Sequence, residues 1–486
     1  MHASHCNCPR LPAARLLSST LGLLVLMAAS APPAAVSPAK AQSPKPIALN
    51  PDNPHYFLFR DRPTVLITSG EHYGAVLNLD FDYEPYLDEL KARGLNLTRT
   101  FSGVYCEDRN SFGIRGNPLA PAAGRLSCPW ARSREPGYAG GGHKYDLSRW
   151  DDAYFARLKD FLAQAGRRGV VVEFVLFCPF YEDGMWNLSP MKAENNVNGV
   201  GKVARTEVYT LQHEDLVAVH QAVTRKIVSE LKDFDNVYYE VCNEPYFGGV
   251  TRPWQDRIIA TIVETEAGFA QKHLIAQNIA NGSRKIEDPN PAVSVFNFHY
   301  ATPPVTVAMN FGLGKVLGDD ETGFKGSSDF VYRAEGWDFL LAGGAVYDNL
   351  DYSFTPDHEA GTAKPNAPGG GGATLRGQLA ILKQFIEGFD FVNMAPDDSV
   401  IQGKLPEKVT ARALVEPGRQ YAVYLRGSGA RQLELKLPAG RYRAEWTNTK
   451  TGAVDQRESF THSDGKRVLA VPPYAEDVAL RITAAK

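Results

Sequence analysis

Two glutamates each stand where a hydrophobic run ends, a position from which an acidic side chain can leave a core and meet a substrate. The run VYYEVCNEPYF (237–247) closes with Asn243, Glu244 and a proline, and the run KVLGDDE (315–321) closes with Glu321. Two carboxylates from separate strands can share catalysis, one as an acid and the other as a nucleophile. We therefore take Glu244 and Glu321 as the candidate catalytic residues.

The alternation of side chains along a strand supports Glu244. Alternate residues share one face of a strand, so Tyr238, Glu240, Cys242 and Glu244 should point the same way. If Glu240 faces an interior, Glu244 faces the same interior at the end of the strand. The alternative is that Glu244 only caps a helix or a turn.

The choice of the second carboxylate is less direct, because GDDETGF (318–324) supplies three acids. Alternation puts Asp320 on the opposite face of the strand, which leaves Asp319 or Glu321 to face the site. We expect Glu321. The alternative is an acidic turn that binds a metal, but no histidine cluster lies nearby in the sequence.

Two facing carboxylates suit the cleavage of a glycosidic bond. One must be protonated, to give a proton to the leaving oxygen, and the other must be ionised, to attack the anomeric carbon. A separation of roughly 5–5.5 Å gives retention of configuration through a covalent intermediate. Asn243 is placed to bond a sugar 2-hydroxyl, a contact that strengthens in the transition state.

Several other residues are candidates for contacting a sugar. Arg99 lies between Leu97 and Phe101 on a buried-looking run, which favours a buried ion-pair partner over a surface arginine. His299 ends a strand and precedes Tyr300, which favours a site residue over the alternative of a core histidine. The full set of expected substrate-binding residues is Arg99, Asn243, His299, Tyr300, Glu71, His72 and Trp186.

Some of these residues have a structural alternative of equal weight. Glu71 and His72, in TSGEHYGAV, either bind the outer hydroxyls of the sugar or only close the turn after the first strand. Trp130, Trp186 and Tyr181 lie in long loops, where an aromatic ring either stacks on a sugar or fills a satellite core.

The elements that must position these residues alternate between strands and helices. Expected strands cover residues 63–69, 96–101, 170–177, 237–241, 273–279, 293–300, 315–321 and 345–354. Expected helices cover residues 81–94, 151–169, 213–234, 254–272, 332–344 and 374–389. Eight strands in this pattern favour a (β/α)8 barrel, a TIM barrel, over residues 46–397. Long loops at 102–146 and 178–210 should then border the site at the C-terminal face.

The two ends of the chain have different patterns. From residue 398 to 486, runs such as RQYAVYL and RQLELKL alternate at period two between short turns, which predicts a small antiparallel β-sandwich. Residues 1–41 combine two arginines, a short apolar run and small residues, which predicts a signal peptide. The apolar run is shorter than the roughly 20 residues of a spanning helix, so a membrane anchor is the less favoured alternative.

Charge and cysteine content narrow the class of protein. Cleavage after Ala41 would remove three basic residues and no acidic one, which takes the net charge from −3 to −6. No basic block suggests nucleic acid as a partner. In an oxidising compartment Cys106 and Cys128 either form a disulfide or stay free. Cys178 and Cys242 each end a buried-looking strand and are expected to act as small apolar residues.

Taken together, these residues resemble the clan A glycoside hydrolases, in particular the cellulase-like group, over about residues 50 to 395. The similarity rests on Arg99, on Asn243-Glu244-Pro245, on His299-Tyr300, on Glu321 and on the stretch 145–177. It implies that Glu244 is the acid/base, that Glu321 is the nucleophile, and that Arg99 supports the nucleophile. It also implies that Asn243, His299 and Tyr300 surround the reacting sugar, and that the C-terminal sandwich is an accessory domain.

One departure from this group concerns the eighth strand, where a tryptophan often forms a sugar platform. The run AVYDNLDYSF offers only Tyr347, Tyr352 and Phe354. The expected function is nevertheless a secreted or periplasmic retaining glycosidase that acts on an oligosaccharide or polysaccharide without a cofactor. A carbohydrate-binding protein on a decayed barrel and a metal-dependent hydrolase are the alternatives. The sugar, the linkage and the oligomeric state are left open.

Overall fold

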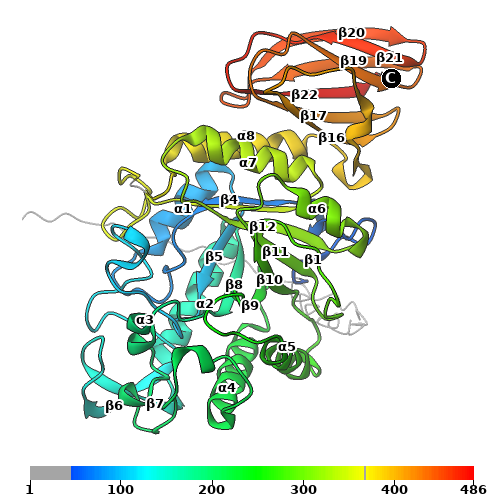
Figure 1. Ribbon diagram of the computed structural model, residues 1–486. Coiled ribbons are helices and arrows are strands. Elements are labelled where there is room, and N and C mark those ends of the chain that lie inside the picture. Colours follow the sequence, from blue (N-terminus) through cyan, green and yellow to red (C-terminus); the bar gives the residue numbers. More distant parts are fainter. Residues whose placement is uncertain (1–44, 366–367, 486) are drawn as a thin grey trace, which may run out of the picture. The chain divides into compact units, whose positions relative to one another are not determined.

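The computed structural model describes residues 45–365 and 368–485, so the predicted signal peptide lies outside the described part. Its centre is an eight-stranded parallel sheet in which neighbours follow the order β4-β13-β12-β11-β10-β9-β8-β5 (Figure 1). The strands are β4 (Leu66–Gly70), β5 (Leu97–Phe101), β8 (Val171–Phe177), β9 (Val237–Cys242), β10 (Ile275–Asn281), β11 (Val295–His299), β12 (Val316–Thr322) and β13 (Val346–Leu350). The backbone N–H of Asn96 donates to the Ile67 carbonyl at 3.3 Å, which joins the two ends of the sheet into a barrel.

Helices surround this barrel, and their ends follow local signals in the sequence. The helix α1 begins after Asp82, whose side chain accepts from the N–H of Glu84, and ends at Gly94 with a φ of 74°. The helices that follow barrel strands are α1 (Tyr83–Arg93), α2 (Asp152–Arg167), α4 (Glu214–Leu231), α5 (Arg252–Glu266), α6 (Val305–Asn310), α7 (Asp329–Leu341) and α8 (Ala373–Glu387). The short helix α6 was not expected. Between β10 and β11 the described chain runs through a loop instead of a helix.

The boundaries of the first and last expected strands differ from the sequence interpretation. The expected strand 63–69 divides into β3 (Arg62–Thr64) and β4. In fact β3 belongs to a small antiparallel sheet with β1 (Ala48–Leu49) and β2 (Phe57–Phe59). The eighth strand ends at Leu350, which leaves Tyr352 and Phe354 in the loop that follows.

The two long loops carry structure of their own. The loop after β5 contains a hairpin formed by β6 (Trp130–Pro136) and β7 (His143–Trp150). The loop after β8 contains the short helix α3 (Asp183–Leu188). In Figure 1, α3, β6 and β7 lie close together at the lower left, below the barrel strands.

A β-bulge in β12 changes the direction of the side chains near the predicted nucleophile. In the pairing with β11, Phe298 lies opposite Asp319 and His299 lies opposite Glu321, so Asp320 is an extra residue. A bulge interrupts the simple alternation of faces. The prediction that Asp320 lies on the opposite face from the site is therefore wrong, and its side chain lies with Arg99 and His299 in the barrel interior.

The C-terminal region forms antiparallel sheets, as predicted. One sheet has the order β14-β16-β17-β22-β19-β20 and the other the order β15-β18-β21. The strands are β14 (Ala395–Pro396), β15 (Ile401–Gln402), β16 (Thr410–Glu416), β17 (Gln420–Arg426), β18 (Gln432–Leu437), β19 (Gly440–Thr447), β20 (Val454–His462), β21 (Gly465–Ala470) and β22 (Asp477–Ala484). Their inner faces enclose a separate hydrophobic core. Arg333 of α7 pairs with Asp477 at 2.7 Å, which links this region to the barrel helices.

Two further sequence expectations have a structural outcome. Among the described residues, no helix combines the length and the apolar content that crossing a membrane requires. Cys106 and Cys128 are both buried and both free thiols, so of the two alternatives the structure shows unpaired cysteines and no disulfide between them. Cys178 and Cys242 are buried as expected.

Candidate active site

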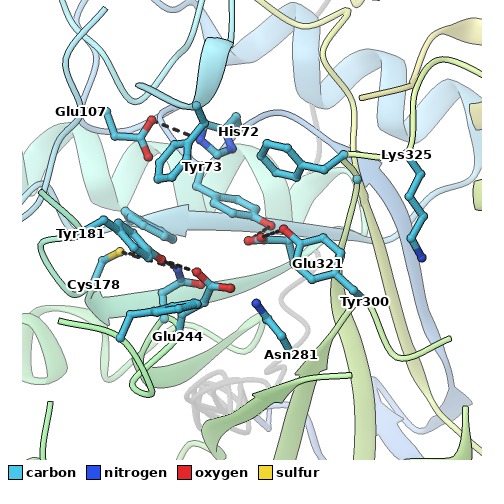
Figure 2. A pocket seen from close by; sticks show the side chains of 16 residues that line it. His72, Tyr73, Glu107, Cys178, Tyr181, Glu244, Asn281, Tyr300, Glu321 and Lys325 are labelled. Atoms are coloured by element: carbon cyan, nitrogen blue, oxygen red, sulfur yellow. Dashed lines mark hydrogen bonds and ion pairs between the residues drawn. The ribbon is translucent and has the colours of Figure 1, made fainter. Parts of the chain in front are cut away.

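A pocket of about 490 Å³ opens where the barrel strands end, and both predicted catalytic glutamates line it. Figure 2 shows Glu244 and Glu321 on facing sides of this pocket, with tyrosines beside each. Its other lining residues come from loops that follow several strands, including His72 after β4 and Asn281 at the end of β10. A site at the C-terminal ends of barrel strands is the usual location in this fold.

The two carboxyl groups are close enough to act on one bond. One oxygen of Glu244, one oxygen of Glu321 and one ring nitrogen of His299 all lie within 4.8 Å of one another. His299 Nδ1 is 3.2 Å from Glu244 Oε1 and 3.5 Å from Glu321 Oε1. Glu244 and Glu321 keep only 7% and 6% of their surface exposed, so both are screened from bulk water yet open to the pocket.

Glu321 lies in surroundings that favour its charged form. Tyr300 donates to Oε1 at 2.5 Å, Tyr73 donates to Oε2 at 3.1 Å, and the Arg99 guanidinium lies 3.5 Å from Oε2. Burial alone would raise the pKa of Glu321. The charges of His299 and Arg99 and the Tyr300 hydrogen bond outweigh burial and hold that pKa well below its ordinary value.

Glu244 is fixed by a different pair of tyrosines. Tyr181 donates to Oε2 at 2.5 Å and Tyr246 donates to Oε1 at 3.2 Å. The backbone of Glu244 has a φ of 36°, in the region that non-glycine residues seldom adopt. Such strain persists where the surroundings enforce it, and it is often found at functional sites.

Arg99 organises the barrel interior beneath the pocket. Its Nη2 donates to Glu240 at 2.5 Å and to Asn243 Oδ1 at 2.7 Å, and its Nε lies 3.3 Å from Asp320. The guanidinium is buried and ion-paired, as its place on the strand predicted, and it also contacts Glu321, as the family resemblance implied. Arg99 therefore connects the amide of Asn243 with the carboxylate of Glu321.

Asn243 and His299 both lie beside the glutamates, but His299 is fully buried and, unlike Asn243, is not among the residues that line the pocket. Asn243 lines the pocket and donates from Nδ2 to the Tyr181 hydroxyl at 2.9 Å. His299 contacts both glutamates through Nδ1, while Nε2 lies 3.4 Å from Asp320. Burial would lower the pKa of His299, but the charges of Glu321 and Asp320 outweigh burial and raise it well above the ordinary value.

The two residues of the Glu71-His72 pair have different roles. His72 lines the pocket, and its Nε2 lies 3.4 Å from Glu107. Glu71 does not line the pocket, because its carboxylate accepts from the N–H groups of Gly74 and Ala75 at 2.8 and 3.0 Å. The expectation that Glu71 contacts the substrate is therefore wrong, and its turn-closing alternative holds. Burial raises the pKa of Glu71 to about 7.

The loop aromatics also separate into two groups. Tyr181 lines the pocket. Trp186 is buried in a satellite core, packs on Phe180 with ring centroids 4.8 Å apart, and donates from Nε1 to the Val203 carbonyl at 3.1 Å. Trp186 is thus not a pocket residue, in contrast to the prediction. Trp130 is fully buried as well.

Sequence reasoning missed much of the pocket wall. Tyr73 directly follows His72 and Phe247 follows the Asn-Glu-Pro triplet, so proximity to a predicted residue was an available signal for both. Glu107, Phe112 and Phe324 lie in loops without a periodic pattern, and only the folded chain brings them to the pocket.

Two groups of side chains have the spacing of metal ligands. One is the set Glu244, His299 and Glu321. In this set the carboxylate oxygens already accept hydrogen bonds from tyrosine hydroxyls. The other is the interior set Glu173, Glu240 and Asp320, which lies around the Arg99 guanidinium. Burial and the neighbouring Glu240 charge raise the pKa of Glu173 to about 8.

The known proteins were compared with this chain by sequence and by structure, and only the comparison of structures found similar proteins. No family model and no curated protein matches the sequence. A protein from Bacteroides vulgatus ATCC 8482, provisionally assigned as a glycoside hydrolase, has a TM-score of 0.66 at 16% identity over 92% of this chain and 83% of its own.

Two further solved structures are similar to this chain in fold. A glycoside hydrolase has a TM-score of 0.60 at 15% identity, over 91% of this chain and 97% of its own. A glycoside hydrolase family 5 protein from Bacteroides vulgatus ATCC 8482 has a TM-score of 0.59 at 14% identity, over 90% of this chain and 93% of its own. The chain therefore has the barrel fold of these glycoside hydrolases, followed by antiparallel C-terminal sheets.

Proposed function

We propose that this protein is a retaining glycoside hydrolase that cleaves β-glycosidic bonds by double displacement. The observation that supports this most directly is the spacing of Glu244 and Glu321, whose nearest carboxylate oxygens lie within 4.8 Å in one pocket. Retaining glycosidases place their two carboxyl groups about 5–5.5 Å apart, whereas inverting enzymes leave about 6.5–9.5 Å for a water molecule. The glycoside hydrolases among the structural neighbours favour the same reaction class.

The surroundings of the two groups suggest their roles. Glu321 has a lowered pKa and a charged partner in Arg99, so it is ionised and ready to attack the anomeric carbon. Glu244 gives its proton to the departing oxygen as the C–O bond breaks and the bond from Glu321 forms. Glu244 then takes a proton from water, which attacks the glycosyl-enzyme and releases Glu321.

Neighbouring side chains assist these steps. Tyr300 and Tyr73 hold the Glu321 carboxylate in one orientation, and Tyr181 does the same for Glu244. Asn243 and His72 are placed to bind sugar hydroxyls from two sides of the pocket. The predicted signal peptide assigns this activity to the periplasm or the cell exterior, with an oligosaccharide or a polysaccharide as substrate.

The proposal is tested with Glu321→Ala and Glu244→Ala on a panel of aryl β-glycosides. Both variants should lose almost all turnover. Azide should convert Glu321→Ala into a producer of the inverted glycosyl azide and Glu244→Ala into a producer of the retained one, because azide replaces a different group in each. Glu182→Ala, an exposed glutamate at the start of α3, is the matched control. Wild-type turnover in either pocket variant would end the proposal.

Two other functions are separated by the same measurements. A carbohydrate-binding protein on this barrel would bind sugars without turnover and would not respond to loss of both glutamates. A metal-dependent hydrolase is the other alternative, because Glu244, His299 and Glu321 have ligand spacing. Dialysis against EDTA distinguishes it. Unchanged activity is expected, since tyrosine hydroxyls already occupy the carboxylate oxygens.

A further inference from the structure

Three phenylalanines stand out on the surface of this protein. Among the large hydrophobic residues exposed in the described ranges, the aromatic ones are Phe112, Phe247 and Phe324, at 43%, 45% and 40% exposure. All three line the pocket of Glu244 and Glu321, although they come from loops after β5, β9 and β12. The other exposed hydrophobic residues are aliphatic and lie outside this pocket. We call Phe112, Phe247 and Phe324 the aromatic rim.

Ring contacts connect the rim to the acid/base side of the site. Phe247 lies 5.8 Å from the Tyr181 ring and Phe112 lies 5.3 Å from it. Tyr181 donates to Glu244, the group that would protonate the leaving oxygen. Phe112 also meets Phe324 at 6.5 Å, which makes the row continuous. Phe324 also lies 6.3 Å from the Tyr300 ring, and Tyr300 donates to Glu321. The part of a substrate next to the acid/base is its leaving group, so Phe112 and Phe247 lie on the leaving-group side of the pocket and Phe324 extends the row toward Glu321.

The backbone at the rim is held in an unfavourable conformation. Phe112 and Phe324 have φ values of 55° and 58°, in the left-handed region that bulky residues avoid. Strained positions of this kind persist only where their surroundings enforce them, and they cluster at ligand sites. Exposure and strain both disfavour phenylalanine here, so an interaction with a ligand is the physical reason to place it there.

Two polar groups next to the rim, the Lys325 amine and the Asn281 Oδ1, are already engaged. Lys325 pairs with Glu335, and Figure 2 shows its amine directed away from both glutamates. The Asn281 Oδ1 accepts from Tyr246 at 2.5 Å. A sugar can stack its C–H face on one ring, but a sugar enclosed among all three rings would bury hydroxyls that phenyl rings cannot pair, and each unpaired hydroxyl would weaken binding.

We propose that the aromatic rim binds an apolar aglycone, an alkyl or aryl group, so that the substrates of this enzyme are glycosides with apolar leaving groups. This inference rests on the proposed glycosidase function. Each methylene of an apolar chain buried against the three rings would add to the binding free energy. The hydroxyls of a second sugar in the same place would lose hydrogen bonds to water without gaining hydrogen bonds to the protein.

The test compares two glycosides with the same sugar and leaving groups of similar basicity. The sugar is the one preferred in the aryl-glycoside panel, and the substrates are its methyl and n-octyl β-glycosides. Burial of three or four methylenes predicts a kcat/KM about 100-fold higher for the octyl glycoside. Phe247→Ala and Phe324→Ala should each lower the octyl-to-methyl ratio by about tenfold, because each removes one face of the apolar site.

The controls make each outcome interpretable. Val468→Ala changes an exposed apolar residue in β21, outside the pocket, and should leave the ratio as it is. An octyl-to-methyl ratio near one, or a disaccharide of the same sugar hydrolysed faster than the octyl glycoside, would overturn the inference while leaving the glycosidase function intact. Absence of hydrolysis for every glycoside would instead refute the glycosidase function.

Discussion

Together with the charges of His299 and Arg99, the hydrogen bond from Tyr300 to Glu321 should set the acidic limit of the proposed catalysis. Tyr300 donates to Oε1 at 2.5 Å, and this bond is one of the causes that lower the pKa of Glu321. A hydrogen bond to a charged group contributes about 1.5–3 kcal/mol. At about 1.36 kcal/mol per pKa unit, Tyr300→Phe should raise the pKa of Glu321 by about one to two units.

The sign of the effect on the rate follows from the proposed role of Glu321 as the nucleophile. The nucleophile attacks only when ionised, so activity falls as the pH drops through its pKa. A lowered pKa keeps wild-type Glu321 ionised in mildly acidic solution, and a raised pKa moves the acidic limb of the profile to higher pH. The assay is kcat/KM for an aryl glycoside, measured across the acidic range for the wild type and the variant.

A neighbouring tyrosine provides a matched control. Tyr352 lies near Glu321 and has a buried hydroxyl without a hydrogen-bond partner, so Tyr352→Phe removes the same atom without removing a bond to the carboxylate. Tyr352→Phe should leave the acidic limb in place. An unmoved limb in Tyr300→Phe, or an equal displacement in both variants, would show that the Tyr300 hydrogen bond does not control the ionisation of Glu321.

Three further predictions concern stability and thiol chemistry. Burial holds the pKa of Asp348 well above its ordinary value, and both of its oxygens lack hydrogen-bond partners. The native state keeps this proton at pH values where the unfolded chain has released it, so the wild type loses stability as pH rises above about 4, the ordinary pKa of aspartate. Asp348→Asn should therefore gain thermal stability relative to the wild type as pH rises from there, by up to about 1.4 kcal/mol per pH unit; an equal Tm difference at all pH values would contradict this. Trp186→Phe should lower stability by about 1–3 kcal/mol, because the hydrogen bond to the Val203 carbonyl is lost, yet leave KM unchanged; a raised KM would place Trp186 at the substrate after all. Burial raises the pKa values of Cys106 and Cys128 to about 12, so both should resist a thiol reagent in the native protein and react fully after unfolding without reductant, and a shortfall of two thiols would reveal a disulfide.

The barrel and the pair of glutamates in its pocket could be predicted because both depend on local patterns. Hydrophobic runs of strand length alternating with amphipathic helices indicate a parallel barrel, whatever the loops contain. In such a barrel the C-terminal ends of all strands meet at one face, so Glu244 and Glu321, each at the end of a run, had to lie near each other. Arg99, His299 and Asn243 were found for the same reason.

The remaining site residues depend on contacts between loops that are far apart in the sequence. The bulge at Asp320 arises where β12 pairs with β11, so strand alternation within residues 315–321 could not reveal it. Glu71 and Trp186 have the chemistry of binding residues. However, the Glu71 carboxylate accepts hydrogen bonds from backbone N–H groups, and Trp186 is buried in a satellite core.

The sequence by itself therefore determined the architecture and the pair of acids, since periodicity and strand ends are properties of short segments. Only the tertiary structure decided which aromatic rings reach the pocket and which carboxyl groups are charged there. Both depend on the distances between side chains from different loops, and those distances exist only when the barrel has closed.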